Sequence, residues 1–157
     1  MKIVFLQTGK TSEKHIAEGV ENYFLRLEKN PGLEIITVPD IRNTANLTKE
    51  EIRKKEGGKI LGKIYGTDYV VLLDERGREF RTVEFASWLE NRLMQAERRL
   101  LFVSGGAWGF SEQVYARADM KISLSKMTFP HQLVRLIFLE QLYRALSIIK
   151  GSPYHHE

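Results

Sequence analysis

Apolar and polar residues follow one another along this chain in blocks whose lengths suit strands and helices. Five short runs are almost continuously apolar or β-branched, a pattern typical of strands that are buried on both faces of a parallel sheet. Longer segments between them carry apolar residues every three or four positions, as one face of a helix requires. The predicted strands are residues 2–8, 33–38, 69–73, 100–104 and 120–124, and the predicted helices are residues 11–29, 47–64, 82–95, a short segment from Ser111 and a long segment from Pro130 to Gly151.

The alternation of strands and helices predicts the fold class and the domain organisation. Repetition of this kind favours an α/β protein, a three-layer α/β/α sandwich with a mostly parallel sheet. A length of 157 residues with 43% hydrophobic residues is sufficient for one core. The sequence contains no internal repeat, low-complexity stretch or long linker. We therefore expect a single domain over residues 1–157.

Glycine and proline interrupt this pattern in two places. Pro31 and Gly32 follow the first predicted helix and are expected to end it in a turn. Gly57, Gly58 and Gly62 fall inside the second predicted helix, where each costs roughly 1 kcal/mol relative to alanine. This cost predicts that the backbone of the helix lies in close contact with another element.

The composition narrows the class of protein. There is no cysteine, which excludes disulfides, thiolate metal sites and cysteine nucleophiles and predicts a cytoplasmic protein. The apolar run at the N-terminus is too short for a signal sequence or a membrane span, so no membrane association is expected. The net charge is +4, from 24 basic and 20 acidic residues, with the excess toward the C-terminal end. Such a mild excess permits RNA binding but does not by itself indicate it.

In open α/β sheets, ligands bind beyond the carboxyl ends of the strands, and three segments occupy that position here. Residues 74–77 are either a solvated turn or one wall of a pocket. Residues 105–109, Gly-Gly-Ala-Trp-Gly, let a ligand approach main-chain donors, although a purely structural turn is the alternative. Their spacing and late position do not match the dinucleotide-binding fingerprint. Residues 125–131, on spacing alone, are a capped helix start.

The last predicted helix is apolar around most of its circumference, so we expect it to be buried on more than one face and to complete a dimer interface. Its polar residues pair at i,i+4: His131 with Arg135 and Glu140 with Arg144. Residues 152–157 add an aromatic ring and two imidazoles, and form either a functional tail or a disordered end. The four histidines lack the spacing of a ligand set, so no metal site is predicted.

Five segments, taken in order, resemble one known family. They are Val-Leu-Leu-Asp at 71–74, Phe-Val-Ser-Gly-Gly at 102–106 with Gly109, Leu-Ser-Lys-Met-Thr-Phe-Pro-His at 124–131, Glu-Gln-Leu-Tyr-Arg-Ala at 140–145 and Pro-Tyr-His at 153–155. Together they are similar to the RlmH (YbeA-like) ribosomal RNA methyltransferases of the SPOUT class, over the whole chain. The resemblance implies a homodimer whose C-terminal segment threads a loop to form a trefoil knot. It also implies S-adenosylmethionine as methyl donor and N3 of a pseudouridine in helix 69 of 23S ribosomal RNA, in the large subunit or the whole ribosome, as target.

The same resemblance assigns residues to the donor and to the chemistry. Leu73, Gly105 and the loop after the fifth strand would form the donor pocket. Tyr154, His155 and His156 of one subunit, with Arg144 and Glu140 nearby, would position the base and assist removal of the N3 proton. Related members often carry arginine or lysine where this chain has His156, which leaves the contribution of that residue open. The loop residues assigned to the donor are Leu124, Ser125, Lys126, Met127, Thr128 and Phe129.

Three other functions fit the same residues. A SPOUT methyltransferase could act on another RNA, although a lone domain without an RNA-binding extension favours the ribosome as substrate. A non-catalytic ribosome-assembly factor would keep the fold without binding the donor. A nucleotide-binding metabolic enzyme would bind a free nucleotide and ignore ribosomes.

Overall fold

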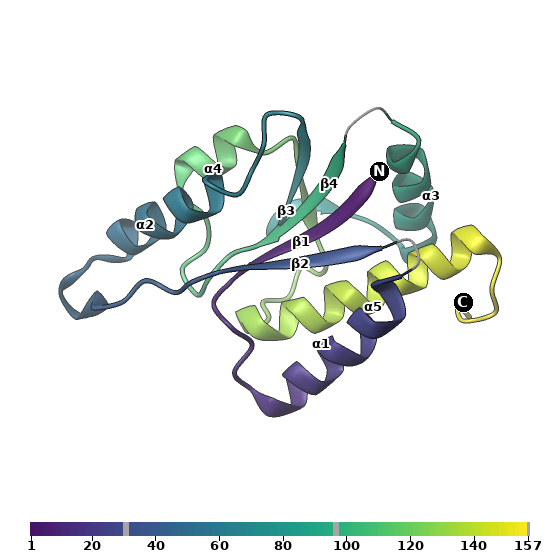
Figure 1. Cartoon of the computed structure of the whole chain (residues 1–157), viewed down its shortest axis with the longest axis horizontal. Coiled ribbons are helices and arrows are strands. Elements are labelled where there is room, and N and C mark those ends of the chain that lie inside the picture. Colours follow the sequence, from purple (N-terminus) through teal and green to yellow (C-terminus); the bar gives the residue numbers. More distant parts are fainter. Residues whose placement is uncertain (30–31, 96–97, 157) are drawn as a thin grey trace.

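The computed structural model describes residues 1–29, 32–95 and 98–156 and contains a five-stranded sheet with helices on both faces (Figure 1). Every neighbouring pair of strands is parallel, in the order β2-β1-β4-β3-β5. The predicted α/β class is therefore confirmed, and the sheet is parallel throughout rather than mostly parallel. The strands are β1 Lys2–Thr8, β2 Leu33–Val38, β3 Asp68–Glu79, β4 Arg99–Ser104 and β5 Met120–Ser123.

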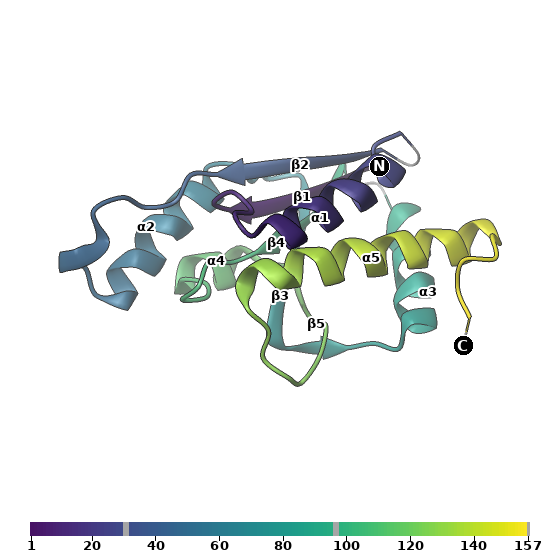
Figure 2. The ribbon, with the colours of Figure 1, turned by 90° about the horizontal axis from the view of Figure 1, so that it is seen from below.

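The helices form the two outer layers of the sandwich. α1, α3 and α5 cover one face of the sheet, and α2 and α4 cover the other (Figure 2). Within the described ranges, no helix is both long and apolar enough to cross a membrane. The helices are α1 Lys14–Leu27, α2 Lys49–Leu61, α3 Thr82–Leu93, α4 Glu112–Arg117 and α5 His131–Lys150, with a 3-10 turn at Thr44–Asn46.

Successive residues of each strand enter two separate cores, which explains why the strands are continuously apolar. In β1, Phe5 faces α5, where its ring lies 5.1 Å from that of Phe138; Phe102 of β4 lies 4.7 Å from the same ring. Val4 and Leu6 point to the opposite core, beneath α2 and α4. These side chains are fully buried, and burial of each stabilises the fold by about 1.5–3 kcal/mol.

β3 runs farther than predicted and includes the polar segment after Leu73. The strand pairs with β5 a second time, after a register shift between Leu73 and Arg78. A Cβ on Gly77 would come within 2.6 Å of the backbone of β5, a closeness that only glycine permits. The segment is therefore an irregular strand and not a free turn.

Of the three glycines predicted inside the second helix, Gly57 explains the predicted close contact. A Cβ on Gly57 would collide with the side chain of Ser111, the residue that caps α4. Gly62 caps the end of α2, and no described atom lies within 4 Å of a Cβ on Gly58. The predicted turn at Pro31 lies outside the described residues.

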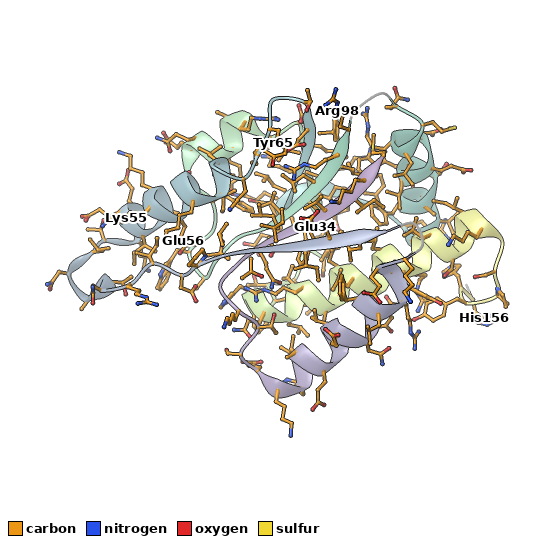
Figure 3. The ribbon with its side chains drawn as sticks, viewed as in Figure 1. Glu34, Lys55, Glu56, Tyr65, Arg98 and His156 are labelled. Atoms are coloured by element: carbon orange, nitrogen blue, oxygen red, sulfur yellow. The ribbon has the colours of Figure 1, made fainter. Side chains whose placement is uncertain are left out.

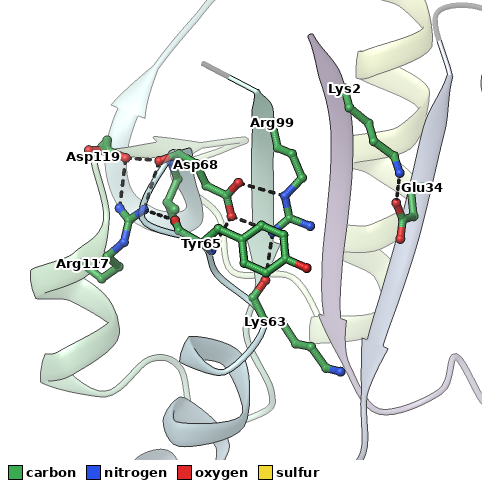
Figure 4. A network of polar contacts seen from close by, with 9 residues as sticks. Lys2, Glu34, Lys63, Tyr65, Asp68, Arg99, Arg117 and Asp119 are labelled. Carbon is green, nitrogen blue, oxygen red and sulfur yellow. Dashed lines mark hydrogen bonds and ion pairs between the residues drawn. The ribbon is translucent and has the colours of Figure 1, made fainter. Parts of the chain in front are cut away.

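An ion-pair network joins the strands at their amino ends, away from the predicted ligand site (Figure 4). Arg99, the first residue of β4, donates to the two carboxylate oxygens of Asp68, the first residue of β3, at 2.8 and 2.6 Å. The ring of Tyr65 lies 4.0 Å from the guanidinium of Arg99, and its backbone N–H donates to Asp68 at 2.7 Å. Burial alone would raise the pKa of Asp68, but these hydrogen bonds and the charges of Arg99 and Arg117 outweigh it and lower the pKa.

Candidate functional site

A cavity of about 750 Å³ lies at the carboxyl ends of β4 and β5 and beside the middle of β3, from Leu73 to Arg76. His131 and Val134 of α5 contribute to its wall. Lys126 does not line the cavity, because its side chain is exposed and its ammonium lies 3.8 Å from the carboxylate of Glu79. The other residues predicted for a donor pocket all line it: Leu73, Gly105, Leu124, Ser125, Met127, Thr128 and Phe129.

Hydrogen bonds of its own polar side chains hold the loop after β5 in place. The hydroxyl of Ser123 donates to the carbonyl of Ser125 at 2.8 Å, and the hydroxyl of Ser125 accepts from the backbone N–H of Met127 at 3.0 Å. Thr128 donates to Glu75 of β3 at 2.9 Å, which joins the loop to the polar part of that strand. A loop fixed in this way presents its apolar side chains to a ligand without a further cost of ordering.

Crowding on the outer side of the turn after β4 explains two of its three glycines. A Cβ on Gly105 would come within 3.2 Å of the ring of Phe110, and a Cβ on Gly106 would collide with the carboxylate of Glu56. Gly109 has a φ of +80°, a left-handed conformation that favours glycine. The turn therefore has a structural reason for its glycines, and its main chain also lines the cavity.

Glu56 lies on α2 behind that turn (Figure 3). Its side chain is only 8% exposed, and its Oε2 has no hydrogen-bond partner among residues 1–29, 32–95 and 98–156. Burial raises the pKa of Glu56, and the negative charge of Asp40 raises it further. The sequence did not single out this residue, since nothing local distinguishes it from the other acidic residues of α2.

Several cavity residues were missed by sequence reasoning, among them Lys49 and Arg53 of α2 and Tyr115 of α4. The hydroxyl of Tyr115 donates to Asp74 and accepts from Arg76 at 3.1 Å. Burial, followed by the hydrogen bond to Asp74, raises the pKa of Tyr115. The only sequence signal was the i,i+4 spacing of Lys49 and Arg53, which indicates a shared helix face but not what that face meets.

A second polar cluster lies at the far end of α5, where the tail contacts the helix. Arg144 donates to Oε1 of Glu140 from Nε at 2.8 Å and from Nη2 at 2.5 Å, which confirms the predicted pair. Nη1 of Arg144 lies 3.3 Å from Nδ1 of His155. Because arginine can only donate, Nδ1 accepts and the proton of a neutral His155 is on Nε2, which is buried and has no partner in the described part of the chain. His156 is exposed.

Tyr154 completes this cluster. Its ring packs edge-on against Tyr143, with the centroids 4.7 Å apart. Its hydroxyl lies 3.2 Å from that of Tyr23 and donates to Oε1 of Glu140 at 3.3 Å. The hydrogen bond with Tyr23, together with burial, raises the pKa of Tyr154 to about 12. The phenol is therefore protonated at physiological pH and can donate a hydrogen bond but not serve as a base.

The cavity and the cluster are not brought together within one chain. His131, at the start of α5, lines the cavity, whereas Arg144 lies about 20 Å farther along the helix axis. Figure 2 shows α5 running from beside α4 to the tail, and Figure 3 shows Glu56 on α2 well apart from His156 in the tail. The predicted site residues therefore form two groups, one at each end of α5.

The predicted pairing of His131 with Arg135 is wrong. Arg135 is fully buried and donates instead to the carbonyl of Thr8 at 2.5 Å and to the hydroxyl of Thr11 at 2.9 Å. Burial, followed by the positive charge of Arg135, lowers the pKa of His131. In the part of the chain that the structure describes, no group of three or more His, Asp or Glu side chains is placed to hold a metal ion.

Comparison with known proteins gives matches along the whole chain. Residues 1–155 match the protein family described as "Predicted SPOUT methyltransferase". The chain is 47% identical over 157 residues to "Ribosomal RNA large subunit methyltransferase H" of Phocaeicola vulgatus, with 100% of both chains covered. Proteins with the same name from Bacteroides fragilis and Parabacteroides distasonis are 46% and 47% identical, again with 100% of both chains covered.

Proposed function

This chain belongs to the SPOUT methyltransferase family, and on that premise we propose that it methylates large-subunit ribosomal RNA, using S-adenosylmethionine to modify N3 of a pseudouridine in helix 69 of 23S RNA. The observation that carries this proposal is the identity of 46–47% to ribosomal RNA large subunit methyltransferases H, which leaves no part of either chain uncovered. The cavity at the strand ends supplies the place for a donor.

The cavity fits the donor in size and in chemistry. Its volume of about 750 Å³ lies in the range of sites for ligands of this size. Leu73, Leu124 and Phe129 offer apolar surfaces for the adenine, and the main chain at Gly105 can bind its polar edge. When bound, the donor supplies an electrophilic methyl group on a sulfonium sulfur. The chain itself contributes the shape of the pocket and the hydrogen-bonded loop after β5, which together hold the donor in one orientation.

Gly105→Val tests this assignment. The side chain would displace Phe110, whose ring lies 3.2 Å from the position of a Cβ on Gly105, and would deform the turn. We expect donor affinity, measured by calorimetry, to fall about tenfold or more, since overpacking of a tight site costs on the order of 1–3 kcal/mol. Gly58→Val is the matched control because a Cβ there meets no described atom within 4 Å. Unchanged affinity in a folded Gly105→Val protein would remove the glycine turn from the donor site.

The cluster at the end of α5 is suited to stabilising an anion. N3 of a pseudouridine lies between two carbonyl groups and must lose its proton before its electron pair attacks the methyl carbon, as the carbon–sulfur bond breaks. The guanidinium of Arg144 is a donor that can bind the carbonyl oxygens, where the negative charge develops, and the Nε2–H of His155, buried within the single chain, is a second donor once the tail turns it toward the substrate. The N3 proton then leaves to solvent.

The remaining residues of the cluster position these two donors. Oε1 of Glu140 accepts from Arg144 and from Tyr154, so this carboxylate is already engaged and does not serve as the base. Tyr154 holds the tail against α5 through Tyr143 and Glu140. His156 is exposed at the end of the tail, where it can contact the RNA without touching the reacting atoms.

A homodimer joins the two halves of the site. The cluster lies about 20 Å along α5 from the cavity of its own chain, so the tail of one subunit acts at the cavity of its partner. The chain leaves β5 at the edge of the sheet and returns through α5 over the face that carries α1 and α3. We assign to this return path the trefoil knot of the SPOUT fold.

Labelled methyl transfer to ribosomes that lack the modification tests the function. Matched ribosomes without the pseudouridine are the control. We expect incorporation only into the pseudouridylated ribosomes. Donor binding without incorporation would contradict the target and direct the search to another RNA, whereas absence of donor binding would favour a non-catalytic assembly factor.

A further inference from the structure

Two of the exposed large apolar side chains lie at the mouth of the cavity. Trp108, in the turn after β4, is 44% exposed, and Met127, in the loop after β5, is 73% exposed. Burying a tryptophan ring would stabilise the chain, so an exposed ring beside a binding cavity indicates a surface that meets another molecule. Met127 belongs to the loop assigned to the donor, whereas Trp108 has no part in the donor pocket described above.

Two cations of α2 hold the Trp108 turn. The ammonium of Lys49 lies 4.7 Å from the centroid of the indole, and Arg53 donates to the carbonyl of Trp108 at 3.4 Å. Lys49 and Arg53 are separated by one helical turn and both line the mouth of the cavity. On β3 the acidic residues are already engaged, because Asp74 accepts from Tyr115 and Glu75 accepts from Thr128. The α2 side of the mouth therefore carries two cations, Lys49 and Arg53, beside an exposed aromatic ring.

We propose that Trp108, Lys49 and Arg53 form a docking platform for the unpaired loop of the RNA substrate, with the indole stacked on a nucleobase and the two cations bound to phosphates. This inference rests on the proposed function. Unpaired RNA is recognised by aromatic stacking on splayed bases and by positive charge along the backbone.

Charge complementarity favours RNA at these two cations. The phosphates of an RNA loop have the opposite charge, and the exposed indole offers a flat surface that accepts any base.

Steady-state methylation by Trp108→Ala and Trp108→Phe tests the stacking. In Trp108→Ala we expect KM for ribosomes to rise on the order of tenfold, with kcat and donor affinity unchanged, while Trp108→Phe keeps most of the binding. Tyr65→Ala is the matched control, since Tyr65 is 61% exposed, also has a cation near its ring and lies at the amino ends of the strands, away from the cavity. The proposal would be overturned if Trp108→Ala left KM unchanged, or if Tyr65→Ala raised KM equally. It would also be overturned if Trp108→Ala lost donor affinity to the same degree, or became a monomer in sedimentation.

The cations are tested by salt dependence. The double variant Lys49→Gln, Arg53→Gln should lose two phosphate contacts with the RNA. Each contact with a single strand contributes about 0.7 to the slope of log affinity for RNA against log salt concentration. We therefore expect the magnitude of this slope to fall by about 1.4 in the double variant. An unchanged slope would overturn the assignment of both residues.

A binding measurement separates this proposal from the proposed function. The chain has two tryptophans, so Trp88→Phe leaves Trp108 as the only reporter of indole fluorescence. A synthetic helix 69 hairpin should quench this fluorescence and compete with ribosomes. If the hairpin quenches the fluorescence but no methyl group is transferred, the docking platform is supported and the proposed function is refuted. If methyl groups are transferred without quenching, the function is supported and the platform is refuted.

Discussion

Replacing Arg144 or His155 with alanine is expected to lower the rate of methyl transfer by about 10²–10³-fold, the usual effect of removing one donor to a developing negative charge. Donor affinity should remain within about twofold of the original value, because neither residue is among those that line the cavity. Single-turnover methylation with saturating donor, together with calorimetry, measures the two quantities separately. Lys150→Ala, which removes an exposed cation from the same helix, is the control and should keep full activity.

A mixed dimer shows whether the two halves of the site come from different subunits. One subunit carries Gly105→Val and the other Arg144→Ala, with different tags for purification. If the tail acts on the partner, one intact cavity meets one intact tail, and about half of the original activity should remain. If cavity and tail act within one chain, no intact site exists and the heterodimer should be as inactive as its parents. Equal loss of donor binding in Arg144→Ala would contradict the division of roles itself.

The architecture was predictable because burial on both faces leaves a direct mark on the sequence. Strands such as β4 have no polar side to place in water, and their continuous apolar runs predicted a parallel sheet. The extension of β3 was not predictable from local pattern. Residues 74–77 have the polar composition of a turn, and their strand geometry depends on pairing with β5 and on the close approach at Gly77.

The candidate site was predictable in part for a similar reason. The rule that ligands bind beyond strand ends located the cavity, and the residues that the resemblance assigns to the donor, apart from Lys126, all line it. Lys126, which the resemblance also assigns to the donor, does not line the cavity, because a continuous segment does not reveal which of its side chains turns outward. Trp108 and Lys49 are far apart in the sequence and come together because α2 packs on the core beneath α2 and α4. No local sequence pattern indicates that these two side chains are close.

The largest effect on stability is expected at the amino ends of the strands, where Asp68→Ala should lower the free energy of unfolding by about 3–5 kcal/mol. The side chain of Asp68 is fully buried and that of Arg99 is 12% exposed, so the substitution leaves a guanidinium nearly out of water without its anion. The backbone N–H of Tyr65 also loses its acceptor. The melting temperature should fall by roughly 6–20 °C, at about 2–4 °C per kcal/mol for a chain of this size.

A second ion pair in the same region supplies the control. Lys2 and Glu34 also form an ion pair, but their side chains are 56% and 41% exposed, so Glu34→Ala should cost less than about 1 kcal/mol. Chemical denaturation at pH 7 distinguishes the two variants. Equal losses in both would mean that burial does not set the strength of the Asp68–Arg99 pair.

The pH dependence of the same variant tests the electrostatic origin of its effect. The pKa of Asp68 is lowered in the folded chain from 3.8, because the bonds from Arg99 and Tyr65 outweigh burial. Its contribution is therefore present above that unfolded value and is lost as the pH falls through the lower folded pKa. The gap in unfolding free energy between the original chain and Asp68→Ala should narrow as the pH is lowered from 5 to below about 3. A gap that stays constant over this range would assign the loss to packing and not to the charge of Asp68.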